Sequence, residues 1–151
     1  MRAVIQRVSQ AAVVVDKKTA AEIKKGLLIF LCVCSDDNQK DLEYLAKKIA
    51  NMRIFTDQNG KFNLSVKDIG GSCIVVSQFT LAADTKKGNR PSFFYAAEPK
   101  KAKDFYEKFI AILNDQYRIP TQGGVFAAHM DVSLTNDGPV TIFIDSKINI
   151  Q

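Results

Sequence analysis

The sequence predicts an α/β fold with a mixed β-sheet and two main helices. Two segments, 39–52 and 99–116, carry apolar side chains at helical spacing. Two apolar runs, 27–33 and 72–79, have the composition of strands that are buried on both faces. The chain of 151 residues is 46% hydrophobic and 25% charged, which fits one globular domain, so we expect a single domain over residues 1–151.

The elements before the first buried run are expected to be strands. Residues 1–9 and about 11–16 alternate between polar and apolar side chains, which predicts two strands. A polar turn at 17–19 leads to a third strand over 20–24, and Gly26 then punctuates the chain.

Each predicted helix has a recognisable start. The first should follow a group of N-cap candidates at 35–38 and end near Met52, whereas the second should run from Pro99, which suits a first turn, to about Gln116. The apolar stripes are Leu42, Leu45, Ala46, Ile49 and Met52 in the first helix, and Ala102, Phe105, Tyr106, Phe109, Ile112 and Leu113 in the second. We expect these stripes to belong to the core.

Turn signals predict two hairpins. The shorter one covers 53–62 and turns at Asn-Gly, and the C-terminal one joins Met130–Leu134 to Val140–Ile144 through an Asn-Asp-Gly-Pro turn. A sharper interpretation of the second turn stays open. Gly138 has no Cβ, so its backbone can approach a ligand closely, and a cis bond before Pro139 would cost only about 0.5–1 kcal/mol.

Composition and charge exclude several classes of protein. The net charge of +5 permits a polyanionic partner without requiring one. The longest apolar run, 27–34, is far short of the ~20 residues that span a bilayer, so no membrane association is expected. The three cysteines lie in apolar runs without CxxC spacing, and the only histidine is His129. We therefore expect a cytoplasmic protein with buried, reduced thiols, no metal site and no cofactor.

The segment Ser77-Gln78-Phe79-Thr80-Leu81 lies where a buried strand gives way to a loop, and strand ends are common ligand sites in α/β proteins. Ser77 and Thr80 could be nucleophiles only with a base within hydrogen-bond reach. A triad of Ser77, His129 and Asp131 can be written, but no spacing supports it. The alternative is that the backbone N–H groups of this turn form an oxyanion hole.

Two sets of basic residues have two interpretations each. Lys86, Lys87 and Arg90 lie in a loop that either contacts phosphates or is simply solvated. Arg7, on the first strand, either points to solvent or holds another loop by hydrogen bonds to carbonyls, for which a guanidinium group is well suited.

Four segments together resemble the D-aminoacyl-tRNA deacylase family over essentially the whole chain. They are Met1–Val8, Ser77–Leu81, Lys86–Phe93 and Thr135–Thr141, in this order. The Ser-Gln-Phe-Thr and Asn-x-Gly-Pro-Val motifs are the specific part of the resemblance.

The resemblance implies a deacylase-type fold with β/β/α layers and a homodimer with its active sites at the subunit interface. It implies hydrolysis of the ester between a D-amino acid and the terminal adenosine of tRNA, and of glycyl-tRNA mischarged on the alanine tRNA. By this resemblance Ser77, Gln78, Phe79 and Thr80 are the catalytic residues that line the pocket for the adenosine and the ester. Gly138 and Pro139, joined by a cis bond, form a chiral filter that enters the partner's site, and Arg7 braces them.

Two other functions remain open. One is a Ser or Thr esterase that acts on small metabolites, for which Thr80 would need a base that the sequence does not show. The other is a non-catalytic RNA-binding module built on the basic loop from Lys86 to Arg90. The loop lacks interleaved aromatic residues suited to base stacking, which argues against that module.

Overall fold

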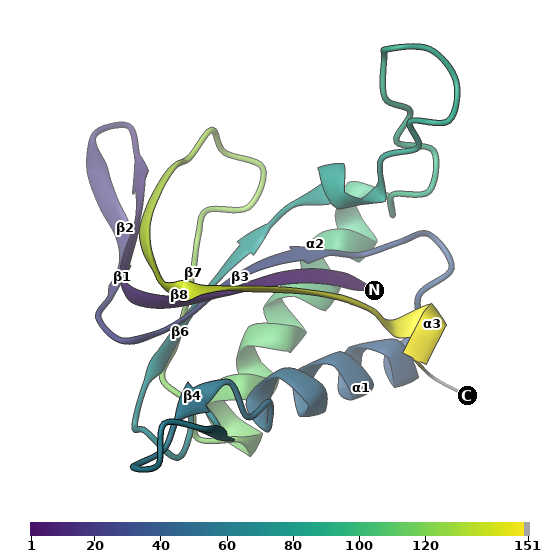
Figure 1. The fold of residues 1–151 in the computed structure, drawn as a ribbon. Coiled ribbons are helices and arrows are strands. Elements are labelled where there is room, and N and C mark those ends of the chain that lie inside the picture. The colour runs from purple at the N-terminus through teal and green to yellow at the C-terminus, as the bar shows by residue number, and fades with distance from the viewer. Residues whose placement is uncertain (150–151) are drawn as a thin grey trace.

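The computed structural model describes residues 1–149, and the last two residues of the predicted domain, 150 and 151, lie outside the described residues. The fold is a mixed sheet packed against helices (Figure 1). In chain order the elements are β1 (Arg2–Val15), β2 (Lys18–Ile23), β3 (Gly26–Cys32), α1 (Gln39–Ala50), β4 (Phe55–Thr56), β5 (Phe62–Leu64), β6 (Ser72–Ser77), the 3₁₀ turn η1 (Phe79–Ala82), α2 (Pro99–Ala111), the π-helical turn η2 (Ile112–Gln116), β7 (Thr121–Gly123), β8 (Asp131–Asp145) and α3 (Ser146–Asn149).

The main sheet is organised around β1. Strands β2, β1, β3, β6 and β7 are neighbours in that order, and β8 pairs with the other edge of β1. The pairs that involve β1 are antiparallel, whereas β3–β6 and β6–β7 are parallel. Parallel neighbours need long crossover connections. Here α1 lies in the connection from β3 to β6, and α2 in the connection from β6 to β7. The predicted α/β class with a mixed sheet and two main helices is confirmed.

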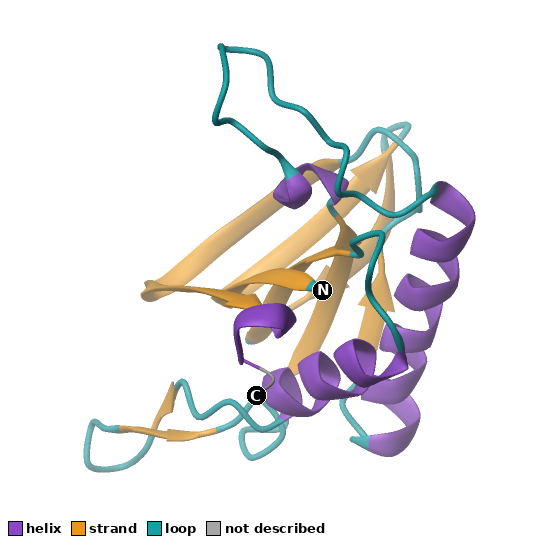
Figure 2. Cartoon of the chain, turned by 90° about the vertical axis from the view of Figure 1, so that its right-hand side faces the viewer, coloured by secondary structure: helices purple, strands orange, loops and turns teal. Residues whose placement is uncertain are grey.

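Two cores give the molecule its layers. On β3, Leu27 and Ile29 contribute to the core under the helices, while Leu28 contributes to a second core on the opposite face. The second core includes Val13 of β1 and Ile23 of β2, so this end of the sheet folds over β3 and β6. Both main helices lie on one side of the strands (Figure 2). Two strand layers and one helix layer are the arrangement that the resemblance implied.

The helices confirm the sequence analysis most closely. Asn38 caps α1 by accepting a hydrogen bond from the Lys40 N–H, and Asp41 accepts one from the Asn38 N–H, which completes a reciprocal capping box. Pro99 occupies the first turn of α2. The second helical segment does end at Gln116, but its last turn is π-helical. Among the described residues, no helix is long and apolar enough to cross a membrane.

The predicted division of the N-terminus into two strands is wrong. Residues 2–15 form one strand, which carries one extra residue, Ser9, relative to β8: Val8 pairs with Asn136 and Gln10 pairs with Thr135. Such a bulge shifts which side chains face the core, so that the alternation in the sequence appears to restart.

The predicted C-terminal hairpin is also wrong. Asp131–Asp145 is one strand, and both predicted arms pair with β1 instead of with each other. Gln6 pairs with Thr141 and Val8 pairs with Asn136, so the four residues 137–140 stand opposite Arg7 alone. The Asn-Asp-Gly-Pro segment is therefore a wide bulge within a strand. Its turn chemistry resembles that of a hairpin because both require the chain to leave the ladder.

A polar cluster around Asp41 joins α1 to the residues that follow β8 and predicts acid sensitivity. Asp41 is almost fully buried, and burial alone would raise its pKa, but hydrogen bonds from Ser146, Lys147 and the Asn38 backbone lower this pKa to about 2 from its ordinary 3.8. A lowered folded-state pKa means that this stabilisation is complete above about pH 4 and is lost as the pH falls towards 2. We expect the urea midpoint of Asp41→Asn to change less between pH 5 and pH 2 than that of the wild type. Equal changes in the two proteins would contradict this assignment.

Candidate active site

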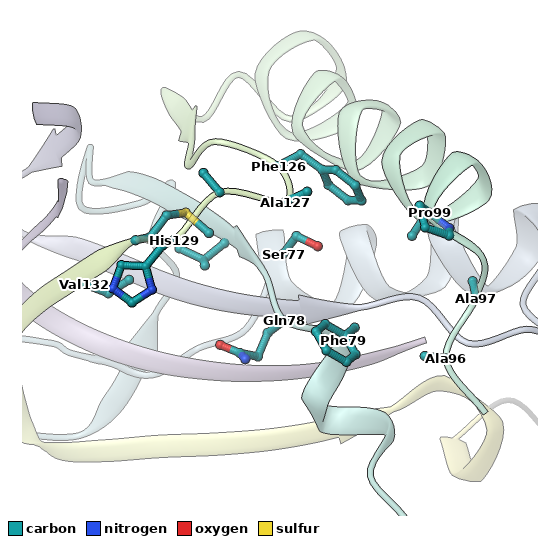
Figure 3. Close-up of a pocket in the computed structure, with 14 residues that line it drawn as sticks. Ser77, Gln78, Phe79, Ala96, Ala97, Pro99, Phe126, Ala127, His129 and Val132 are labelled. Atoms are coloured by element: carbon teal, nitrogen blue, oxygen red, sulfur yellow. The ribbon is translucent and has the colours of Figure 1, made fainter. Parts of the chain in front are cut away.

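The main cavity opens at the end of β6 and has a volume of about 560 Å³ (Figure 3). Its walls come from the end of β6, the start of α2 and the segment that leads from β7 to β8. The lining residues are Val76, Ser77, Gln78, Phe79, Ala96, Ala97, Pro99, Ala102, Phe126, Ala127, Ala128, His129, Met130 and Val132. Of the predicted catalytic residues, Ser77, Gln78 and Phe79 line this cavity, whereas Thr80 follows immediately on η1.

Backbone pairing sets the shape of the turn after Ser77. Ser77 pairs with Leu31 on β3, and the Gln78 N–H donates to the Leu31 carbonyl at 2.8 Å. The chain then turns into η1, where the Gln78 side-chain amide donates to the Thr80 hydroxyl. The first N–H groups of a helical turn have no partner within the turn. The turn therefore presents backbone donors beside the cavity.

The histidine does not form a triad with Ser77. The side chain of His129 is 97% exposed, and its Nε2 lies 4.0 Å from an Asp131 carboxylate oxygen. In Figure 3 the imidazole lies at the rim of the cavity, away from the Ser77 hydroxyl. No hydrogen bond joins these two side chains in the part of the chain that the structure describes. Among the described residues, His129 is therefore not placed to act as a base for Ser77.

Arg7 lies beneath the bulge of β8. It is buried, and its guanidinium donates to the Asp137 carbonyl at 2.8 Å and to the Ile54 carbonyl at 2.6 Å. The rings of Phe55 and Phe62 lie 6.0 Å and 5.1 Å from its central carbon. Of the two interpretations of Arg7, the structure favours the one in which it contacts a loop.

The bulge itself has two unusual backbone features. The Gly138–Pro139 bond is cis, and Gly138 has φ +144°. A Cβ on Gly138 would lie 2.8 Å from a Val140 methyl and 3.1 Å from an Arg7 nitrogen. Sequence reasoning did not select Asn136, whose amide oxygen accepts from the Val140 N–H at 2.7 Å and so closes the bulge. Asn136 directly precedes Asp-Gly-Pro, and asparagine at the start of a turn often bonds the backbone of the turn, so this position is the signal that could have identified it.

The bulge and the cavity lie far apart within one chain. Ser77 pairs with Leu31, Leu31 pairs with Ala3, and Ala3 pairs with Ile144, so Ser77 lies three strands away from β8. The bulge stands opposite Arg7, four residues along β1 from Ala3. Typical strand spacing and rise place the two on the order of 20 Å apart along the sheet. The structure therefore does not bring Gly138 and Pro139 together with Ser77–Phe79 in one subunit.

The basic loop projects beyond the sheet (Figure 2). Asp84 and Ser92 pair across its base, and Lys86, Lys87 and Arg90 are exposed. The loop from Lys86 to Arg90 carries no interleaved aromatic residue, but Phe79, Phe93, Phe94 and Tyr95 are exposed beside it. Sequence spacing concealed this, since Phe79 precedes the loop and the other three follow it.

A family model described as D-Tyr-tRNA(Tyr) deacylase matches residues 4–145 of the chain. The chain belongs to the D-Tyr-tRNA(Tyr) deacylase family. Relatives named D-aminoacyl-tRNA deacylase include one from Thermotoga petrophila, 54% identical over 147 residues, and one from Flavobacterium psychrophilum, 56% identical over 147 residues. Each alignment covers 97% of this chain and 98% of the relative. The resemblance drawn from the four segments is confirmed.

Two solved structures have the same fold as this chain. One described as a c-Myc DNA unwinding element binding protein is 40% identical, has a TM-score of 0.91, and covers 96% of this chain and 98% of its own. Another, from the structural analysis of a probable eukaryotic D-amino acid tRNA deacylase, is 16% identical with a TM-score of 0.76 and covers 95% and 97%. At that identity the second comparison concerns the fold alone, and it confirms the expected deacylase-type fold.

Proposed function

We propose that this protein is a D-aminoacyl-tRNA deacylase, a hydrolase that cleaves the ester between a D-amino acid and the terminal adenosine of tRNA and rejects L-aminoacyl-tRNA. The observation that carries the proposal is the cavity at the end of β6, lined by the Ser77-Gln78-Phe79 motif of a family whose members are named for this reaction. The cavity volume of about 560 Å³ lies within the usual range of ligand pockets and leaves room for an aminoacylated nucleoside.

The active site is proposed to form between two subunits of a homodimer. In one chain the Gly138–Pro139 bulge lies on the order of 20 Å from the Ser77–Phe79 side of the cavity, so a filter made of this bulge would act on another chain's cavity. A two-fold symmetric pair places each bulge in the partner's site with one kind of contact, as dimer symmetry requires. Among the described residues β8 pairs with β1 alone, and its other edge leaves the bulge open for such an encounter.

Chirality follows from how the bulge would hold the substrate. The carbonyls of Gly138 and Pro139 capture the α-amino group of the amino acid. With that group held, the side chain of a D-amino acid points out to solvent, whereas the side chain of an L-amino acid is driven into the backbone. A rigid steric wall tolerates any D side chain. It also admits glycine, which has no side chain to reject, so glycyl-tRNA mischarged on the alanine tRNA is a second substrate.

The chemistry requires positioning more than an activated side chain. An aminoacyl ester is already activated, and the backbone N–H groups of Phe79 and Thr80 can stabilise the oxyanion that forms when water attacks its carbonyl carbon. The substrate's own 2′-hydroxyl can assist the attacking water. The Thr80 hydroxyl accepts a hydrogen bond from Gln78 and has no histidine beside it. The Thr80 side chain is therefore not the nucleophile in this proposal. This geometry disfavours the alternative of a Ser or Thr esterase.

The test of this function is deacylation of matched D-Tyr-tRNA and L-Tyr-tRNA, with glycyl-tRNA(Ala) as a third substrate. We expect hydrolysis of the D-tyrosyl and glycyl esters, while the L-tyrosyl ester decays at its rate in buffer. Equal rates on the two enantiomers would contradict the proposal.

The basic loop is proposed to contact tRNA phosphates. Replacing Lys86, Lys87 and Arg90 by Ala together should weaken tRNA binding and reduce the slope of log K against log salt by about 2–3, because fewer counterions are released. The matched control replaces Lys40, Lys47 and Lys48 on α1, which removes the same charge from an exposed surface elsewhere. If both triple variants change the slope equally, the loop acts only through net charge.

A further inference from the structure

Four exposed aromatic side chains lie in two pairs beside the candidate active site, and the proposed reaction gives no role to the rings of Phe93, Phe94 and Tyr95. The exposed fractions of Phe79, Phe93, Phe94 and Tyr95 are 55%, 36%, 84% and 50%. The rings of Phe79 and Phe93 meet edge to face with centroids 5.1 Å apart, and those of Phe94 and Tyr95 do so at 5.7 Å. We call these four residues the aromatic track. Large apolar side chains that gather at a surface usually mark an interaction site.

The backbone beneath the aromatic track is held at several points. On one side Asp84 and Ser92 exchange two backbone hydrogen bonds of 2.7 Å and 2.9 Å. On the other side the Ser35 N–H donates to the Tyr95 carbonyl at 2.9 Å, and the next residue, Ala96, pairs with Cys34. The chain thus cannot easily turn these rings inward, so they are presented to solvent by a fixed support.

The aromatic track runs from the candidate active site to the basic loop. Phe79 lines the main cavity at one end. At the other end Tyr95 lines two smaller hollows, one shared with Lys86 and one shared with Phe94 and Lys147. Arg2 lies in both hollows, but its guanidinium is engaged by Asp145 and the Leu81 carbonyl. Three carboxylates also line these hollows: Asp36 and Asp145 line the one with Phe94, and Asp84 lines the one with Lys86.

We propose that the aromatic track binds the single-stranded nucleotides that precede the terminal adenosine of tRNA, with Phe94 and Tyr95 stacking on their bases. The inference rests on the proposed function, because the adenosine in the main cavity fixes where the preceding nucleotides must leave. Unpaired bases stack on aromatic side chains whatever their sequence, and adjacent cations hold the phosphates between them. The aromatic track lies between a nucleoside-sized cavity and a basic loop, so it offers rings for stacking, and the loop offers cations for the phosphates.

The charge beside the aromatic track favours RNA over a second copy of this chain. Lys86, Lys87 and Arg90 are exposed on the adjoining loop, and the whole chain carries a net charge of +5. Two such basic surfaces would repel each other, whereas the phosphates of an acceptor end would neutralise them. A flexible single strand can also contact two separate pairs of rings.

The test compares Phe94→Leu, which keeps an apolar side chain without a ring, with Phe94→Trp, which keeps a stacking surface. For Phe94→Leu we expect KM for D-Tyr-tRNA to rise about tenfold with kcat unchanged, the usual scale for loss of one stacked base. Phe94→Trp should retain the wild-type KM. D-tyrosyl-adenosine lacks the preceding nucleotides, so all three proteins should cleave it equally. A fluorescent single-stranded RNA with the acceptor-end sequence should show the same order of affinities by anisotropy, without turnover.

The outcomes separate this inference from the proposed function. A wild-type protein that cleaves no D-aminoacyl ester would refute the proposed function, and anisotropy would still test the aromatic track. Unchanged KM and unchanged RNA affinity in Phe94→Leu would overturn the aromatic track while leaving the deacylase intact. If Phe94→Leu lost as much activity on D-tyrosyl-adenosine as on D-Tyr-tRNA, the aromatic track would also be overturned. A lower mass of Phe94→Leu in solution would overturn it as well, because Phe94 would then pack against a second subunit.

Discussion

Replacing Gly138 by Ala is expected to lower kcat/KM for D-Tyr-tRNA at least about 100-fold, the scale at which a displacement of about 1 Å disrupts a site. At φ +144° a residue with a side chain is strained, and the new Cβ would lie 2.8 Å from a Val140 methyl and 3.1 Å from Arg7. The bulge must move, and its carbonyls move with it. The measurement is single-turnover deacylation of D-Tyr-tRNA, with folding checked by circular dichroism.

Gly60→Ala is the matched control. Gly60 also has a positive φ, +75°, but a Cβ there would meet nothing within 4 Å. This variant should lose some stability through backbone strain and keep wild-type kcat/KM. If Gly60→Ala lost activity as severely as Gly138→Ala, the effect would reflect strain in general and not the position of the bulge.

Mixing subunits tests whether the bulge acts on the partner's cavity. Ala127 is exposed and lines the cavity, so Ala127→Trp should obstruct it, and circular dichroism must check folding because the residue has φ +63°. Neither Gly138→Ala nor Ala127→Trp should be active alone. A mixed dimer has one site with an intact cavity and an intact bulge, so an equal mixture should recover about a quarter of wild-type activity. No recovery after confirmed subunit exchange would contradict a site shared between subunits.

Arg7→Met is expected to reduce both stability and discrimination between enantiomers. The guanidinium satisfies the buried carbonyl of Ile54 and the partly buried carbonyl of Asp137. Removal of the partner from the buried acceptor costs about 1–3 kcal/mol, and from the partly buried one less. Without this support the bulge is less well fixed, so we expect kcat/KM for D-Tyr-tRNA to fall about 10- to 100-fold, and the ratio of D to L rates to narrow. Arg7→Lys should lie in between, since one ammonium cannot reproduce the guanidinium fork.

Arg53→Met provides the control for Arg7. Its guanidinium also donates to a backbone carbonyl, that of Asn63, at 2.9 Å, but this contact is exposed to solvent. Water can replace it, so little stability and no selectivity should be lost. If Arg7 had a purely structural role, Arg7→Met would have a lower urea midpoint but the wild-type ratio of D to L rates. That result would refute the proposal that Arg7 positions the bulge.

Local features were predictable from the sequence where the physics is local. Three such features depend on residues within a few positions of each other: an N-cap among residues 35–38, the start of α2 at Pro99, and the buried run that became β3. The Ser77–Phe79 segment was likewise recognisable as a strand end, and its place at the mouth of a cavity follows from where β6 stops. The family could be recognised from motifs because those residues keep their order along the chain.

Pairing across the sheet was decided only by the tertiary structure. The residues of Asn-Asp-Gly-Pro carry the same turn chemistry whether they end a hairpin or bulge from a strand, and it is the pairing of both flanks with β1 that makes them a bulge opposite Arg7. The role of Arg7 was undecided for the same reason, since its partners Ile54 and Asp137 lie 47 and 130 positions away. The aromatic track joins Phe79 to residues beyond the basic loop, and only the folding back of that loop at Asp84 and Ser92 brings them together.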